Sequence, residues 1–175
     1  MKWQKLMAGS FEQVQAEAER VMDGLTLTDA LRQPHPDSNS VGWLVWHLTR
    51  VQDSSVAGFM EEEQLWTKDG WAVRFGRKPD PRDTGSGQNS AQVAAFKVKD
   101  TSILIDYLRA VSARTSKYIN GLSASDLDKK VAGTPFQPPP SVGSYLVMVL
   151  SDNLQHAGQA GYVRGLLTGK GWQPY

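Results

Sequence analysis

SVGSYLVMVLSDNLQHAGQAGYVRGLL, residues 141–167, has the spacing of one long α-helix, with Ser141 as its N-cap and an end near Gly169. Asp152 and His156 lie four residues apart beside its inward-facing stripe, so both side chains leave the same side of the helix. A carboxylate turned toward a core is costly unless something pairs with it. That stripe consists of Tyr145, Val149, Asn153 and Ala160.

Three earlier segments also have helical periodicity, at about 3–23, 40–65 and 100–120. Gly24 and Gly121 follow two of these segments as stop signals, and Ser40 is the expected N-cap of another. Four long helices and no convincing strand predict an all-α fold.

Two short motifs recur about a hundred residues apart and in the same order. SVGWLVWHL (40–48) resembles SVGSYLVMVL (141–150), and GLTLTDALRQP (24–34) resembles GLSASDLDKKV (121–131). We therefore predict a four-helix bundle made of two pseudo-repeated helix pairs, joined by a long crossover loop, in a single domain spanning 1–175.

The crossover is predicted to be mostly loop between 66 and 89, where the sequence is polar, rich in glycine and interrupted by proline. WAVRF (71–75) could form a short extended piece, and 90–96 an extra helical turn. A loop of this length is often functional, as a lid or a pocket wall.

Composition excludes several classes of function. The net charge is +1 with no basic block, so nothing indicates nucleic-acid binding. No apolar run reaches the roughly 20 residues of a membrane span, and the amphipathic start does not resemble a signal peptide, so we expect a cytoplasmic protein. The absence of cysteine excludes disulfides, iron–sulfur clusters, thiolate zinc sites and a cysteine nucleophile.

His47 offers a third polar group on an apolar face, that of Val41, Leu44, Leu48 and Val51. Together His47, Asp152 and His156 would give a divalent cation three ligands from two helices and leave positions open for water or substrate. A simpler interpretation also fits the spacing: Asp152 holds His156 in one tautomer, and His47 is a buried core residue. The pattern leaves both open.

Other features have weaker chemical meaning. Arg164, with Gln159, could contact an anionic cosubstrate, although an arginine late in a helix also suits the helix dipole. His35, between two prolines, predicts a surface turn. The glycines 158, 161 and 165 favour close helix packing, and four tryptophans could form aromatic core, a pocket mouth or a dimer seam: Trp43, Trp46, Trp66 and Trp71.

SVGWLVWHLTRVQD (40–53) and DNLQHAGQAGYVRGLL (152–167) resemble the DinB-like superfamily of four-helix metal proteins, which includes mycothiol-dependent maleylpyruvate isomerase and bacillithiol S-transferases. The family pattern is a histidine in the second helix and a His/Glu/Asp-x-x-x-His pair in a later one, which maps onto His47, Asp152 and His156. Many members carry histidine or glutamate where this chain has Asp152, so the metal and any borrowed activity depend on an aspartate variant of the site.

This resemblance implies a divalent metal, zinc or nickel, with mycothiol or bacillithiol as cosubstrate, and a homodimer. Arg164 is the residue that we expect to bind this cosubstrate. The function it implies is a thiol-dependent S-transferase or isomerase acting on a small molecule. Two alternatives remain: a metal-dependent hydrolase, and a non-enzymatic, stress-linked helical bundle that binds small molecules.

Overall fold

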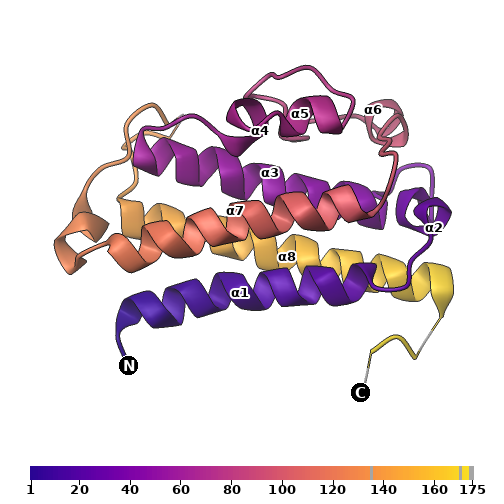
Figure 1. Ribbon diagram of the computed structural model, residues 1–175, viewed down its shortest axis with the longest axis horizontal. Helices are drawn as coiled ribbons and strands as arrows, with labels where there is room; N and C mark the ends of the chain where they lie inside the picture. Colours follow the sequence, from indigo (N-terminus) through magenta and orange to yellow (C-terminus); the bar gives the residue numbers. More distant parts are fainter. Residues whose placement is uncertain (135, 170, 174–175) are drawn as a thin grey trace.

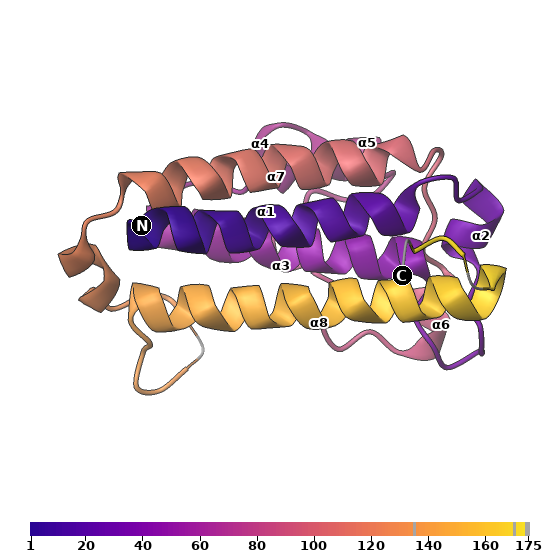
Figure 2. The same ribbon diagram turned by 90° about the horizontal axis from the view of Figure 1, so that it is seen from below.

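The computed structural model describes all residues except 135, 170 and 174–175. Four long helices lie side by side in it (Figures 1 and 2): α1 Trp3–Met22, α3 Val41–Met60, α7 Ser102–Gly121 and α8 Val142–Thr168. Helices α7 and α8 each pack against both α1 and α3, which occupy opposite corners of the bundle. The predicted all-α four-helix bundle is confirmed, and the described residues contain no β-strand.

The two helix pairs are joined by a long crossover that runs over α3, as Figure 1 shows. Helices α3 and α7 consequently run in the same direction. Five short helical segments complete the described chain: α2 Leu27–Leu31, α4 Leu65–Lys68, α5 Trp71–Arg74, α6 Ser90–Ala94 and the 3₁₀ turn η1 Ala124–Asp128.

The repeated Ser-Val-Gly motif is a helix start in both halves. The Ser40 hydroxyl accepts a hydrogen bond from the amide of Trp43, and the Ser141 hydroxyl accepts one from the amide of Ser144. Each serine satisfies an amide that the first helical turn leaves without a partner. Both predicted N-caps are therefore confirmed.

The second long helix is shorter than predicted, ending at Met60 instead of near residue 65. Glu61 adopts a left-handed conformation, with φ of 54°, which stops the helix. The backbone then restarts as α4, because the Asp53 carboxylate accepts hydrogen bonds from the amides of Leu65 and Trp66 at 3.0 and 2.8 Å.

The segment 71–75 is helical, so the expected extended piece is wrong. A helical turn places Trp71 and Phe75 on the same side, and both rings pack against Tyr107 with centroid distances of 5.2 and 5.8 Å. The extra turn predicted at 90–96 is present as α6. Burial of aromatic side chains thus orders part of a segment that reads as loop.

The core is centred on α3, whose first ten residues are all buried. The four tryptophans singled out above are at most 7% exposed, which makes them aromatic core and excludes the pocket-mouth and dimer-seam interpretations. Exposed apolar side chains gather instead on the outer face of α8: Val147, Met148, Leu154, Tyr162 and Leu166.

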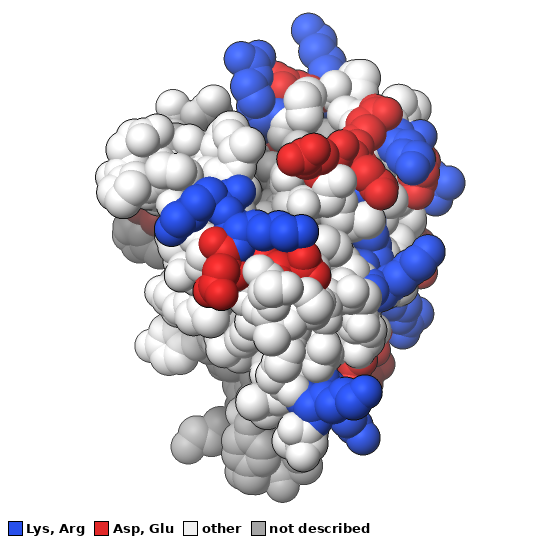
Figure 3. Space-filling model, turned by 90° about the vertical axis from the view of Figure 1, so that its left-hand side faces the viewer, with Lys and Arg blue, Asp and Glu red and all other residues white. Residues whose placement is uncertain are grey.

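Surface charge is mixed. On the end of the molecule seen in Figure 3, acidic and basic side chains are interspersed, as expected from 19 basic and 18 acidic residues. Among the described residues, no helix combines the length and the apolar character needed to cross a membrane.

Candidate metal centre

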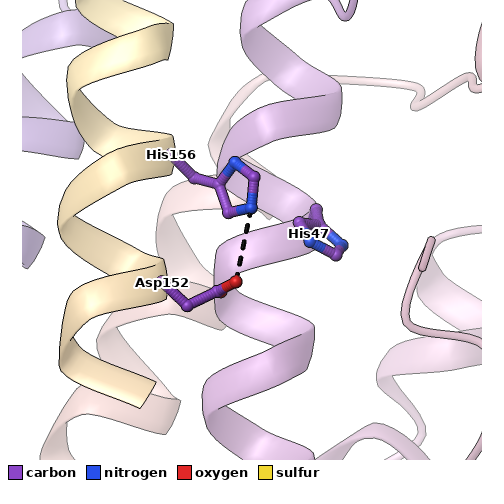
Figure 4. A group of neighbouring side chains, drawn as sticks. All are labelled: His47, Asp152 and His156. Carbon is purple, nitrogen blue, oxygen red and sulfur yellow. Dashed lines mark ion pairs between the residues drawn. The ribbon is translucent and has the colours of Figure 1, made fainter. Parts of the chain in front are cut away.

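Asp152, His156 and His47 come together between α8 and α3 (Figure 4). The first two project from the same side of α8 toward α3, which carries His47. One ligand atom from each residue lies within 4.8 Å of the others. The structure therefore brings together the three residues that the sequence singled out, from helices more than a hundred residues apart.

The His47 imidazole makes a hydrogen bond through Nδ1, and the described residues give Nε2 no hydrogen-bond partner. Its Nδ1 lies 2.6 Å from the carbonyl oxygen of Thr84. Because a carbonyl can only accept, Nδ1 carries the proton, and the lone pair is on Nε2. Burial lowers the pKa of His47, against an opposing effect of the Thr84 carbonyl, so the ring is neutral near pH 7.

Trp43 fixes the plane of this ring. The indole stacks on the His47 imidazole at a centroid distance of 4.8 Å and an interplanar angle of 13°, and His47 is only 6% exposed. His156 meets it edge-on, at 4.7 Å and 83°. The ring is thus enclosed on one face and fixed in direction.

His156 has the same arrangement. Its Nδ1 lies 2.8 Å from Oε1 of Gln159, an acceptor, so this nitrogen donates and Nε2 is left for another partner. Nε2 is 3.5 Å from Oδ1 of Asp152. The Asp152 carboxylate raises the pKa of His156, while partial burial opposes this.

Asp152 is the group whose partners are missing. Its Oδ2 is buried and has no hydrogen-bond partner among the described residues, although the side chain as a whole is 36% exposed. Its Oδ1 faces His156 Nε2 at 3.5 Å, longer than an ordinary hydrogen bond. If that nitrogen is neutral, two lone pairs face each other, which is favourable only with a proton or a cation between them.

A divalent cation fits this donor set. Two neutral imidazole nitrogens and one carboxylate suit zinc and nickel, and an ion with bonds of about 2.1 Å needs its ligand atoms about 3.4 Å apart in tetrahedral geometry. The atoms here lie no more than 4.8 Å apart, so closing onto an ion requires side-chain adjustments of about 1 Å. Although aspartate has a shorter side chain than glutamate, Asp152 reaches the two histidines.

The sequence also allowed a simpler interpretation, in which Asp152 only fixes the tautomer of His156. The structure does not need Asp152 for this role. Gln159, one turn further along α8, already holds Nδ1 of His156. Asp152 therefore remains available for a ligand, in keeping with the usual metal site, in which each histidine donates its other nitrogen to an oxygen.

Arg164 lies two turns beyond His156 on α8, and the structure does not bring its side chain to the cluster. Its guanidinium donates to the carbonyl oxygens of Arg20 and Val21, at the end of α1, at 2.8 and 2.7 Å, and lies over the ring of Trp172. Its role in cofactor binding stays a prediction. His35 is in an exposed turn, as predicted.

Thr84 and Gly85 contribute to the site without having been identified from the sequence, and Trp43 was noted there only as core, pocket mouth or dimer seam and not as a partner of His47. The four-residue spacing of Trp43 and His47 could have indicated their contact. Thr84 acts through a backbone carbonyl in a distant loop, which no side-chain pattern reveals. Of the three α8 glycines noted in the sequence, Gly161 does pack closely, since an added Cβ would lie 3.3 Å from Trp172, whereas an added Cβ at Gly158 would meet none of the described atoms within 4 Å.

Comparison with known proteins gives one family and a close structural relative. The sequence pattern of a family described as the DinB superfamily matches residues 10–160. The crystal structure of the conserved protein of a locus from Enterococcus faecalis aligns with a TM-score of 0.88 and 27% identity, over 97% of this chain and 99% of that one. No curated protein sequence matches the chain.

Proposed function

The chain belongs to the DinB superfamily, and from that premise we propose that it is a divalent-metal-dependent enzyme that uses a low-molecular-weight thiol for S-transfer or isomerisation. The ion proposed is zinc or nickel, held by His47, Asp152 and His156. The thiol proposed is of the mycothiol or bacillithiol type, with a small electrophile as the second substrate.

One observation carries the metal site: Nδ1 of each imidazole lies within hydrogen-bond distance of an oxygen, at Thr84 and Gln159, and His156 Nε2 faces Asp152, whose Oδ2 has no partner among the described residues. The lowered pKa of His47 favours the neutral ring that a metal needs, whereas Asp152 raises the pKa of His156, so a metal must displace a proton from His156 more often than from His47.

The chain's residues divide the work of such a site. Asp152 supplies negative charge that offsets part of a divalent ion's charge, and the histidines fix its position. A bound divalent ion would supply Lewis acidity that lowers the pKa of a coordinated thiol. Trp43 and the loop at Thr84 keep water from the far side of His47, so the substrates approach from the side of Asp152 and His156, whose side chains are 36% and 19% exposed.

A hollow of about 480 Å³ adjoins Gln159, and its size suits a small molecule, although none of the three candidate ligands is among its lining residues. It begins at Gln159, the residue that holds His156, and runs between α8 and the loop before α3. Its walls combine polar and apolar side chains, including Asp37, Ser38, Leu44, Tyr162 and Val163.

Metal binding is tested first, on protein purified without a polyhistidine tag. Elemental analysis should find about one divalent ion per chain, and His47→Ala and His156→Ala should each abolish stoichiometric binding. Equal metal content in wild type and both variants would refute the three-ligand site.

The thiol is tested on the metal-loaded protein with an electrophile, in the presence and absence of a bacterial thiol. We expect turnover only with the thiol. Turnover that does not depend on the thiol would refute the transferase or isomerase proposal and favour a metal-dependent hydrolase. No turnover by a metal-loaded protein over a broad panel of electrophiles would favour the non-enzymatic bundle.

A homodimer and a cytoplasmic location remain predictions. The exposed apolar face of α8, with Leu154 at 52% and Tyr162 at 70% exposure, supports association of two copies better than the buried tryptophans do. Light scattering after gel filtration measures the mass directly: 19.3 kDa for the monomer against twice that value.

A further inference from the structure

Three side chains on one face of α3 bind the crossover loop at 81–88. Trp43, His47 and Arg50 are spaced four and three residues apart, so they form a continuous row along the helix. The loop runs along this row and contacts each of the three.

Each member of the row makes hydrogen bonds to a different part of the loop. Trp43 Nε1 donates to Gln88 Oε1 at 2.9 Å, and His47 Nδ1 donates to the Thr84 carbonyl at 2.6 Å. Arg50, which is fully buried, donates to the carbonyl oxygens of Asp83 and Pro81 at 3.0 and 3.1 Å. These contacts set the register of the loop on the helix, and with it the position of the one carbonyl that reaches His47.

Gly85 makes this close approach feasible. A Cβ at Gly85 would lie 2.8 Å from the ring of Trp46, 2.9 Å from that of Trp43 and 3.1 Å from Nδ1 of His47. Contacts that short force something to shift, and the buried tryptophan rings have little room to move. The residue also has φ of 90°, which favours glycine.

We propose that the 81–88 loop is a positioning element for His47, in which the Thr84 carbonyl keeps Nε2 unprotonated and directed at the metal, and Gly85 is the residue that allows the carbonyl to reach the ring. This inference rests on the proposed metal site. The proposal gives the long loop a function: the loop sets how tightly His47 binds the metal, although no side chain of the loop coordinates the ion.

The chain provides a matched control. Gly87 lies in the same loop with φ of 75°, but a Cβ there would have nothing within 4 Å. Gly85→Ala and Gly87→Ala therefore share the backbone strain of an alanine at positive φ and differ in their contacts with Trp43, Trp46 and His47.

Metal affinity is measured by competition with a zinc chelator for the wild type and both glycine variants. We expect Gly85→Ala to weaken Zn²⁺ binding about 10- to 100-fold, the range typical of losing the hydrogen bond that orients a metal-binding histidine, and Gly87→Ala to bind within about twofold of wild type. Equal affinity of the two variants would overturn the proposal.

Two further measurements keep the test decisive if Gly85→Ala folds poorly. Asp83→Ala removes the bidentate pair with Arg77, at 2.6 and 3.1 Å, that braces the loop from outside the core, and should weaken Zn²⁺ binding in the same direction by a smaller factor. Nitrogen-15 NMR of the metal-free wild type should show His47 protonated on Nδ1. An Nε2-protonated ring, or unchanged affinity in Asp83→Ala, would overturn the proposal.

The experiment separates this inference from the function on which it rests. If the wild type binds no Zn²⁺, the metal site fails, and the His47 tautomer still decides whether the loop positions the ring. If the wild type binds Zn²⁺ and Gly85→Ala binds it equally well, the metal site stands and the positioning proposal fails.

Discussion

Two polar clusters occupy neighbouring turns of α3 and differ in how completely their charges are paired. In the first, buried Asp53 accepts from Tyr107 Oη at 2.7 Å, from two backbone amides and from Arg50 at 3.4 Å. Arg50 has further partners in Gln64 and two loop carbonyls. Neither Arg50 nor Asp53 has a buried polar atom without a hydrogen bond.

The second cluster, His47 with Asp152 and His156, lacks this completeness. His156 Nε2 and Asp152 Oδ1 are 3.5 Å apart, and Oδ2 of Asp152 is buried with no partner in the part of the chain that the structure describes. Both clusters include a carboxylate and a base, so composition alone does not distinguish them. The difference separates a cluster whose charges are paired within the protein, Arg50 with Asp53, from the proposed metal site at His47.

The largest effect is expected from Asp53→Asn. It leaves the buried Arg50 guanidinium without its counter-charge and should lower the free energy of unfolding by about 3–5 kcal/mol. Urea denaturation of the metal-free protein measures this change. A loss below about 1 kcal/mol would mean that this cluster does not hold the fold together.

Asp152→Asn should weaken metal binding and leave the stability of the metal-free protein nearly unchanged, unlike Asp53→Asn. Zn²⁺ affinity should fall at least about 100-fold, equivalent to about 2.7 kcal/mol, while the unfolding free energy of the metal-free protein changes by about 0.5 kcal/mol or less. Chelator competition and urea denaturation give the two values. Strong destabilisation without loss of metal binding would place Asp152 among the structural residues.

Arg164→Gln removes the charged donor to the carbonyl oxygens of Arg20 and Val21 and should cost about 1.5–3 kcal/mol of stability with no change in Zn²⁺ affinity. If Arg164 also binds the thiol cosubstrate, the KM for that thiol should rise while kcat stays constant. An unchanged KM would show that Arg164 contacts α1 and does not bind the thiol.

The smallest effect concerns pH. Because Asp152 raises the folded-state pKa of His156, the pair stabilises the metal-free protein fully below the ordinary histidine pKa of about 6.5, and this stabilisation is lost as pH rises through the raised pKa. The contribution of His47 to stability depends on pH in the opposite direction, because its lowered pKa makes the stability of the folded protein fall as pH decreases.

Comparing wild type with Asp152→Asn isolates the first contribution, because both proteins keep His47. Because solvent screens a partly exposed pair, the wild type should gain less than about 1 kcal/mol over the variant at pH 5.5, and the gain should fall as the pH rises through the raised pKa of His156. Parallel stability curves over this range would show that the pair does not interact in solution.

The four helices could be predicted because each carries its own local signals. Ser40 and Ser141 cap the starts of α3 and α8, and apolar periodicity marks the lengths of the helices. The shared direction of Asp152 and His156 was also predictable, since residues four apart lie on one side of a helix. Local pattern and tertiary packing agree in these elements.

The crossover could not be predicted in the same way, because its structure is set by distant partners. Asp53 starts α4 through backbone amides, Tyr107 receives Trp71 and Phe75, and the Thr84 carbonyl reaches His47 across 37 residues. Such contacts depend on backbone atoms and on the assembled core, and they leave no periodicity in the sequence.

The most direct test is a crystal structure of the protein loaded with Zn²⁺, with anomalous diffraction recorded on both sides of the zinc edge. A zinc-specific peak bonded to His47 Nε2, His156 Nε2 and the Asp152 carboxylate at about 2.0–2.2 Å is the predicted result. No such peak between α3 and α8, or a zinc ion bound elsewhere with His47 and Asp152 unmoved, would contradict the account.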